Sequence, residues 1–180
     1  RMANEKRIDC VILGLLSHEE LTGYEIKKKI DTTLKYFWNA SYGSIYPALG
    51  ELVQRGLAVK REASDNKRYK WIYTITEEGR QYLREWLEQP AERDELRYET
   101  LLKLFFGKEG GDKQALLHID AFEEKIRKEL PYLLRSEAAL SACLDDDVAH
   151  KYYLLTVQFG LKTYRAYLEW CEEAKRVLAD

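Results

Sequence analysis

The sequence is poor in cysteine, the residue that would cross-link the chain or form a redox centre. Only three occur among 180 residues, namely Cys10, Cys143 and Cys171, an odd number at wide spacings. A disulfide framework is therefore not expected. Each thiol lies beside apolar residues in a helical pattern, so buried thiols in a reducing, cytoplasmic compartment are the simpler interpretation. A redox or metal-binding role for one of them is the alternative.

The sequence also lacks a long apolar run. No stretch is long enough to span a membrane, so no membrane partner is expected. The first residues lack the apolar segment of a signal peptide, and those before Ile8 look like a short polar tail. A chain of this length can still bury a core in one domain or two small ones.

Signatures of catalysis and of metal binding are missing as well. His18, His118 and His150 are far apart and share no metal-ligand spacing with one another or with a cysteine. Glycine-rich phosphate loops, nucleophile motifs and paired catalytic acids do not occur. The sequence therefore predicts no cofactor, no metal and no enzyme activity.

Charge is almost balanced overall but uneven along the chain. The formal net charge is −2, whereas residues 27–70 carry ten Lys and Arg against four Asp and Glu. A local basic zone can be the electrostatic footprint of a nucleic-acid site or simply a solvated face. Charge alone leaves both interpretations open.

Helical patterns dominate the first part of the sequence. Residues 8–17 are apolar nearly all round, which predicts a buried helix. Thr22 and Glu25 match a capping box, so a second helix is expected to begin at Thr22. The second half of 41–56 has a helical apolar pattern and is expected to end at Gly56, a typical residue just past a helix end.

A β-hairpin and a capped helix are predicted next. Residues 57–63 and 68–75 alternate in polarity, and the segment 64–67 between them has turn chemistry. Thr76 is a helix cap followed by two acids, and the helix is expected to stop before Pro90.

The charged segment 91–95 is the expected boundary between two domains, 1–90 and 91–180. The second half is predicted to be helical, with a short apolar helix at 98–107. Asp112 is a candidate cap for the next helix, in which Pro131 predicts a kink or a break.

The last predicted helix carries two apolar stripes. One runs from Leu154 to Leu178, and the other contains Val148, Tyr152, Leu155 and Phe159. Two stripes need more than one packing partner, so the second is expected to meet a second subunit. Coverage of both stripes within one chain is the alternative.

The order helix, capped helix, helix, hairpin, helix is that of a winged helix-turn-helix, whose third helix enters the major groove by its N-terminal part. Ser41 and Ser44 are short groups that can bond phosphates or bases. Tyr42 and Tyr46 lie four apart, so their hydroxyls share one side of the helix. Pro47 lacks an N–H and fits only the first turn. Packing of these tyrosines in the core is the alternative.

Small residues and a basic wing complete the predicted DNA-binding surface. Gly43 and Ala48 are expected to keep the helix start thin, and Lys67 and Arg68 to lie along the DNA backbone as part of the wing. A solvated loop is the alternative for the wing. The predicted DNA-binding residues are Tyr24, Lys28, Ser41, Tyr42, Ser44, Tyr46, Lys67 and Arg68.

Four segments together resemble a known family. They are GLLSHEELTGYEIKKKI, FWNASYGSIYPALGELVQRGLAV, YTITEEGRQYLREWL and ETLLKLFFG. The first three resemble the PadR-type transcriptional regulators, and the fourth resembles the start of the helical C-terminal domain of the longer PadR subgroup. The wing differs, since the family often has glycine at the turn where this sequence has SDNKR.

The resemblance implies a mainly α fold with a small two-stranded β wing, comprising a winged helix-turn-helix domain and an α-helical dimerisation domain. It also implies a homodimeric repressor that binds double-stranded DNA at a palindromic operator and is relieved by a small effector. Effectors in the family include phenolic acids, drugs and other aromatic molecules. A winged-helix protein–protein or small-molecule-sensing module that does not bind DNA is the alternative.

Aromatic residues suggest where such an effector would bind. The chain has 13 Tyr and 4 Trp. Trp38, between the second and third helices, and Trp86 and Trp170, on helices that could meet at the domain junction, are the candidate effector-binding residues. Ordinary core aromatics are the alternative. A second rival function is a small-molecule or redox protein that uses Cys171.

Overall fold

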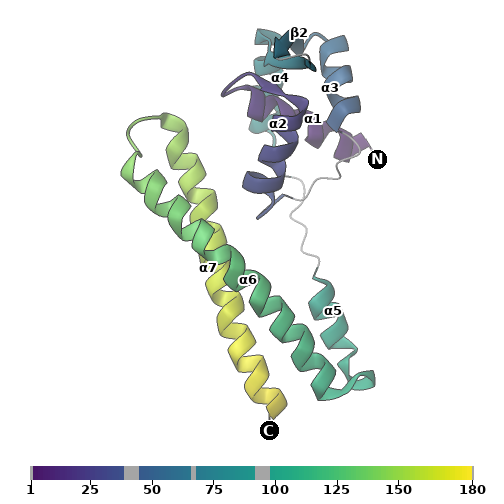
Figure 1. The fold of residues 1–180 in the computed structure, drawn as a ribbon, viewed down its shortest axis with the longest axis vertical. Helices are drawn as coiled ribbons and strands as arrows, with labels where there is room; N and C mark the ends of the chain where they lie inside the picture. The colour runs from purple at the N-terminus through teal and green to yellow at the C-terminus, as the bar shows by residue number, and fades with distance from the viewer. Residues whose placement is uncertain (1, 39–44, 66–67, 92–97, 180) are drawn as a thin grey trace. The chain divides into compact units, whose positions relative to one another are not determined.

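The computed structural model describes residues 2–38, 45–65, 68–91 and 98–179, and the chain forms two compact units, Arg1–Asp94 and Glu95–Asp180 (Figure 1). Within the described residues, no helix is both long and apolar enough to cross a membrane. Each unit has its own secondary structure and is described separately.

The first unit contains helices and a small antiparallel sheet. Its elements are α1 (Met2–Leu16), β1 (Leu21–Thr22), α2 (Gly23–Lys29), the π-helix η1 (Ile30–Leu34), α3 (Ile45–Gln54), β2 (Ala58–Asp65), β3 (Arg68–Ile75) and α4 (Glu77–Glu88). The strand order is β1-β3-β2. The predicted two-stranded hairpin is present, and β1 adds a third strand. Two residues are too few to show the alternation by which a strand is recognised in sequence.

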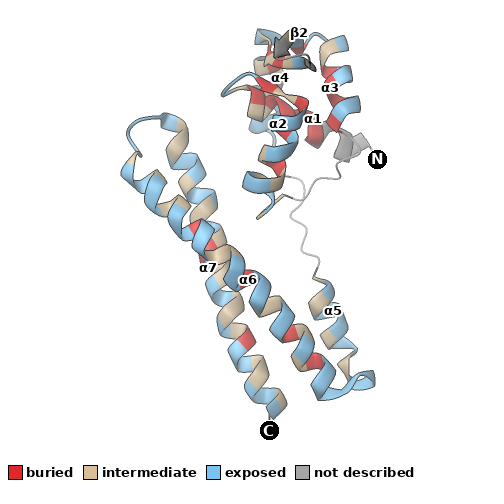
Figure 2. Cartoon of the chain, in the orientation of Figure 1, coloured by how far each residue is buried: buried red, intermediate tan, exposed pale blue. Residues whose placement is uncertain are grey.

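Helices α1, α2 and α3 bury their apolar faces in one core, and the buried residues of these helices are drawn red in Figure 2. Ile12, Ile26 and Leu49 have no exposed surface. The predicted apolar first helix is confirmed, but it begins at Met2, so the tail expected before Ile8 is helical.

The predicted capping box of α2 is confirmed. The Thr22 hydroxyl accepts the Glu25 N–H at 3.2 Å, and the Thr22 N–H donates to the Glu25 carboxylate at 2.8 Å. These bonds from Thr22 favour the ionised carboxylate and lower the pKa of Glu25. The start of α2, which faces α3, is thereby fixed locally.

Two further end signals hold the end of α3 against the start of α4. Gly56 has φ +72°, and the N–H groups of Gly56 and Leu57 donate to the carbonyls of Val53 and Leu52 at 3.1 and 2.9 Å, as in a Schellman motif. The Thr76 hydroxyl accepts the Gly79 N–H at 3.0 Å and donates to the Gly56 carbonyl at 2.7 Å.

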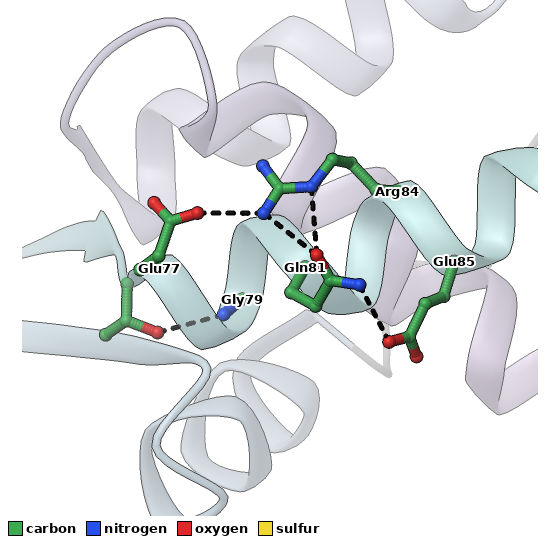
Figure 3. A network of polar contacts seen from close by, with 6 residues as sticks. Glu77, Gly79, Gln81, Arg84 and Glu85 are labelled. Atoms are coloured by element: carbon green, nitrogen blue, oxygen red, sulfur yellow. Dashed lines mark hydrogen bonds and ion pairs between the residues drawn. The ribbon is translucent and has the colours of Figure 1, made fainter.

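The exposed face of α4 carries a polar network, shown in Figure 3. The Arg84 guanidinium donates to Glu77 at 2.8 Å and to Gln81 at 3.0 and 3.1 Å. Gln81 in turn donates to Glu85 at 3.0 Å. Because these groups are exposed, the network stabilises α4 only modestly.

The second unit is all helical. It comprises α5 (Glu99–Phe105), the short 3-10 helix η3 (Gly107–Glu109), α6 (Gly111–Ala142) and α7 (Val148–Ala179). The break allowed at Pro131 is wrong, because α6 runs through it. Two residues later, buried Leu133 packs 3.3 Å from the position that a Cβ on Gly160 of α7 would take. This packing explains why the helix continues despite the lost hydrogen bond. Asp112 lies in the first turn and does not cap the helix.

The two stripes of α7 differ in burial. The stripe packed against α6 contains Leu161 and Cys171, which are 1% and 0% exposed. The other, which we call the outer strip, comprises Val148, Tyr152, Leu155 and Phe159, which are 72%, 58%, 63% and 68% exposed in the single chain. Within the described part of one chain, only the first stripe is covered, and the outer strip stays exposed.

Candidate nucleic-acid interface

Helix α3 is divided into a buried face and an exposed face. Ile45, Leu49 and Leu52 are at most 1% exposed and dock the helix on the core, whereas Tyr46 is 60% exposed. Pro47 is the third residue of the helix and is exposed, as expected of a proline in the first turn. Packing of Tyr46 as an ordinary core tyrosine is thus wrong.

Ala48 was expected to keep the start of α3 thin for entry into a DNA groove, but it does not lie on the exposed face of the helix. The residue is 5% exposed and belongs to the core. Its spacing of three from Ile45 and four from Leu52 places it on the buried face. Gly50, which is exposed, is the small residue on the outer side.

Tyr46 lies against the start of α2. A Cβ built on Gly23 would lie 2.7 Å from Tyr46 Cε1 and 3.3 Å from its Cζ, so the ring is in direct contact with the backbone of Gly23. Tyr73 on β3 is 9% exposed, and burial first, then the nearby Tyr46, raises its pKa. Gly23 from GYEI, Tyr46 from SIYPAL and Tyr73 from YTITEEG thus lie close together. Sequence reasoning missed Gly23 and Tyr73, because nothing local marks a contact between distant segments.

Helix α2 presents two of the predicted residues on one face. Tyr24 is 69% exposed, and Lys28, four residues later, is also exposed. Residues four apart are neighbours on a helix surface, so an aromatic and a cationic group lie together there. Such a pair suits phosphate contact, which positions a protein on DNA.

The described part of the wing is longer than expected. Ser64 and Asp65 are paired within β2, opposite Tyr69 and Arg68, so these two residues belong to the strand rather than to the turn. The predicted residues Ser41, Tyr42, Ser44 and Lys67 lie outside the described residues, and Arg68 is the first residue of β3.

The wing carries a cation–π pair that the sequence did not reveal. The ammonium of Lys60 lies 4.5 Å from the ring centroid of Trp71, which is 46% exposed. Lys60 and Trp71 are on neighbouring strands, where Lys60 is paired with Tyr73 and Glu62 with Trp71. The pair is thus a diagonal contact that depends on the strand register.

Ion pairs reduce the basic zone counted over 27–70. Acids outside that range neutralise three of its cations: Asp9 with Arg55 at 2.8 Å, Glu19 with Lys29 at 2.7 Å, and Glu20 with Arg61 at 2.6 Å. The hydrogen bond from Arg61 is the main cause that lowers the pKa of Glu20. The net charge counted over residues 27–70 therefore overstates the positive charge that this part of the surface presents.

The three candidate effector residues lie in different units. Trp38, partly buried, follows η1, and Trp86, 42% exposed, lies on α4, both in the first unit. Trp170 lies on α7 in the second unit, edge-on to Phe122 with ring centroids 6.0 Å apart. An effector site at the domain junction stays a prediction.

Cys171 does not have the surroundings of a reactive thiol. Its side chain has no exposed surface, and burial is the main cause that raises the pKa of the thiol. Reactive cysteines need accessible, readily formed thiolates. The redox alternative based on Cys171 is therefore wrong. Among the described residues, no group of three His, Cys, Asp or Glu side chains is arranged to hold a metal ion.

Three helices followed by a β-hairpin, with an exposed tyrosine at the start of the third helix, define the winged helix-turn-helix class. A family model described as the transcriptional regulator PadR-like family matches residues 12–85, and another, virulence activator alpha C-term, matches residues 96–179. The negative transcriptional regulator PadR of Bacillus subtilis is 31% identical over 173 residues, which cover 89% of this chain and 91% of that protein. The chain belongs to the PadR-like family of transcriptional regulators, which are not enzymes.

Solved structures agree with this assignment over nearly the whole chain. Bacillus subtilis PadR in complex with operator DNA matches with a TM-score of 0.79 and 27% identity, covering 94% of this chain and 98% of that one. The same protein in complex with p-coumaric acid gives a TM-score of 0.73 at 27% identity, covering 96% and 99%. The Vibrio cholerae virulence activator AphA gives 0.69 at 28% identity, covering 96% and 98%. The predicted mainly α fold with a small β wing is thus confirmed.

Proposed function

We propose that this protein is a homodimeric, cytoplasmic repressor that binds a palindromic operator and is released by a small aromatic effector. The observation that carries the proposal is the two-sided α3, which buries Ile45, Leu49 and Leu52 and presents Tyr46 at its first turn. A helix start of this kind enters the major groove in winged helix-turn-helix proteins. The operator and p-coumaric acid complexes of Bacillus subtilis PadR support both halves of the proposal.

Some of the proposed contacts would read the DNA sequence, and others would position the protein on the DNA backbone. The Tyr46 hydroxyl can donate to a phosphate, and it can donate to or accept from a base edge. Tyr24 and Lys28 on α2 face outward together and would contact the DNA backbone. Ser41, Tyr42 and Ser44 are proposed for the groove, and Lys67 and Arg68 for the wing, on sequence grounds alone.

The second unit supplies a surface for a second copy of the chain. The outer strip of α7 exposes four large apolar side chains in a row, and α5 exposes Leu102, Phe105 and Phe106 by 58%, 83% and 62%. Exposed groups of large apolar side chains of this kind often mark an interface. A two-fold pair of subunits would place one recognition helix in each half-site, about one DNA turn apart.

The effector would act through the spacing or order of the two winged domains. A ligand shifts such an equilibrium only by its different affinity for the DNA-bound and released states. Trp38, Trp86 and Trp170 are proposed to contact it, because flat aromatic ligands stack on aromatic side chains.

Tyr46→Ala is expected to weaken binding to the operator by about fivefold or more, because a good base contact is worth roughly 1–3 kcal/mol. Lys28→Ala is expected to weaken all DNA binding slightly and to reduce the slope of log affinity against log salt by about one. Gel shifts at several salt concentrations, with the promoter region of the protein's own gene as probe, measure both effects.

Circular dichroism and sedimentation confirm that each variant is folded and has the wild-type subunit number. If the Tyr46→Ala variant binds the operator with an affinity within about twofold of wild type, Tyr46 does not contact the groove. If the wild-type protein fails to bind any duplex even at low salt, the alternative of a winged-helix module without DNA binding holds instead.

p-Coumaric acid is expected to quench tryptophan fluorescence to saturation and to weaken operator binding by about 5- to 150-fold, the usual range of allosteric coupling. Replacing Trp38, Trp86 or Trp170 with phenylalanine should reduce the quench, whereas Trp71→Phe on the wing is the matched control. Absence of a saturable change with any phenolic acid or planar cationic drug would count against an aromatic effector.

A further inference from the structure

Gly23, the first residue of α2, has no backbone reason to be glycine. Positive φ angles, which favour glycine, occur at Gly56 and Gly111 among the described glycines, and not at Gly23. Within a helix glycine costs about 0.5–1 kcal/mol relative to alanine, so alanine would suit the backbone better. The reason for the missing side chain must therefore lie in what surrounds it.

The side chain nearest to the missing Cβ of Gly23 is that of Tyr46. An added Cβ would meet its ring at 2.7, 3.3 and 3.4 Å, whereas at Gly14 and Gly50 an added Cβ meets nothing within 4 Å. A separation of 2.7 Å is shorter than van der Waals contact between carbon atoms. The ring of Tyr46 therefore occupies the place that any other residue at position 23 would need.

We propose that Gly23 is a positioning residue for DNA recognition, because its missing Cβ forms the seat on which the Tyr46 ring is held. This inference rests on the proposed contact between Tyr46 and DNA. The seat, next to buried Tyr73, holds one side of the ring, while Tyr46 as a whole remains 60% exposed. An exposed tyrosine without such support would lose rotamer freedom on binding. Because the ring is already held by Gly23 in the free protein, less rotamer freedom is lost when DNA binds.

A methyl group at position 23 would displace the ring tip without harming the fold. The contact is with the far end of a side chain on the surface, so the ring can rotate away, and alanine favours the helix. Gly23→Ala is therefore expected to fold as well as wild type and to hold Tyr46 in a different orientation. This separates the positioning role from a structural one.

The test is a double-mutant cycle with Gly23→Ala, Tyr46→Ala and the double variant, with Gly14→Ala as control. Gly23→Ala should reduce affinity for the promoter probe by about tenfold without lowering the thermal midpoint, and leave the affinity for unrelated duplex and its salt dependence unchanged. In the Tyr46→Ala background the same substitution should change affinity by less than about twofold. Gly14→Ala should bind like wild type.

Two results would overturn the inference alone while the proposed function stands. One is wild-type affinity of Gly23→Ala while Tyr46→Ala is impaired. The other is an equal loss from Gly23→Ala in both backgrounds, which would place its effect in α2 itself. Wild-type affinity of Tyr46→Ala would instead remove the proposed DNA contact, and the inference with it.

Discussion

Gly79→Ala is expected to unfold the winged domain or to lower its stability by at least about 3 kcal/mol. An added Cβ would lie 2.0 Å from the Leu57 carbonyl oxygen and 2.9 Å from Ile75 Cγ1. The backbone cannot move aside, because the same carbonyl accepts the Thr76 N–H at 3.1 Å and Thr76 caps α4. Thermal unfolding followed by circular dichroism should show the unfolding midpoint of the winged domain falling by more than about 10 °C.

Gly14→Ala is the matched control for this prediction. It also adds one methyl group to a helical glycine, but an added Cβ there meets nothing within 4 Å. It should leave the midpoint unchanged or raise it slightly, since alanine is the better helix former. A midpoint of Gly79→Ala within about 2 °C of wild type would show that α4 does not pack on Leu57 as described.

Phe159→Glu is expected to dissociate the proposed dimer and, with it, to abolish tight operator binding. Phe159 is 68% exposed in the outer strip of α7, and a charge placed there would be buried against apolar side chains of the second copy. Removal of a large aromatic from an interface core commonly costs at least about 2 kcal/mol, and the added charge increases that cost. Sedimentation should show a monomer at concentrations where wild type is a dimer.

Gln158→Glu is the control for the added charge. It introduces the same carboxylate one residue earlier, where the side chain points about 100° away around the helix. It should remain dimeric and bind the promoter probe as wild type does. If the Phe159→Glu variant is still a dimer, the outer strip is not the interface. If the wild-type protein is a monomer, the proposal of a homodimer is wrong.

The sequence predicted those parts of the fold that depend on residues close together in the chain. Thr22 with Glu25, Gly56 after α3 and Thr76 before α4 are end signals that act within a few residues, and each is present as expected. The apolar pattern of 41–56 also predicted a helix, and the structure has α3 there. Such features need only backbone geometry and local hydrogen bonding, which the sequence encodes directly.

Pro131 shows where a local rule allowed two outcomes and the break was wrong. A proline inside a helix removes one hydrogen bond, and this predicted a kink or a break. Helix α6 nevertheless continues to Ala142 and buries Leu133 against α7. Tertiary packing along a long helical hairpin outweighs the loss of one bond, and no sequence window contains both helices.

Tertiary structure also decided the composition of the candidate site. It brought Tyr46 onto Gly23, paired Asp9 with Arg55, and placed Lys60 over Trp71. The sequence by itself predicted a winged helix-turn-helix fold and, through its resemblance to the PadR-type regulators, a role in transcription. What Tyr46 rests on, and which cations remain to face DNA, depends on contacts between residues far apart in the chain, because only folding sets those distances.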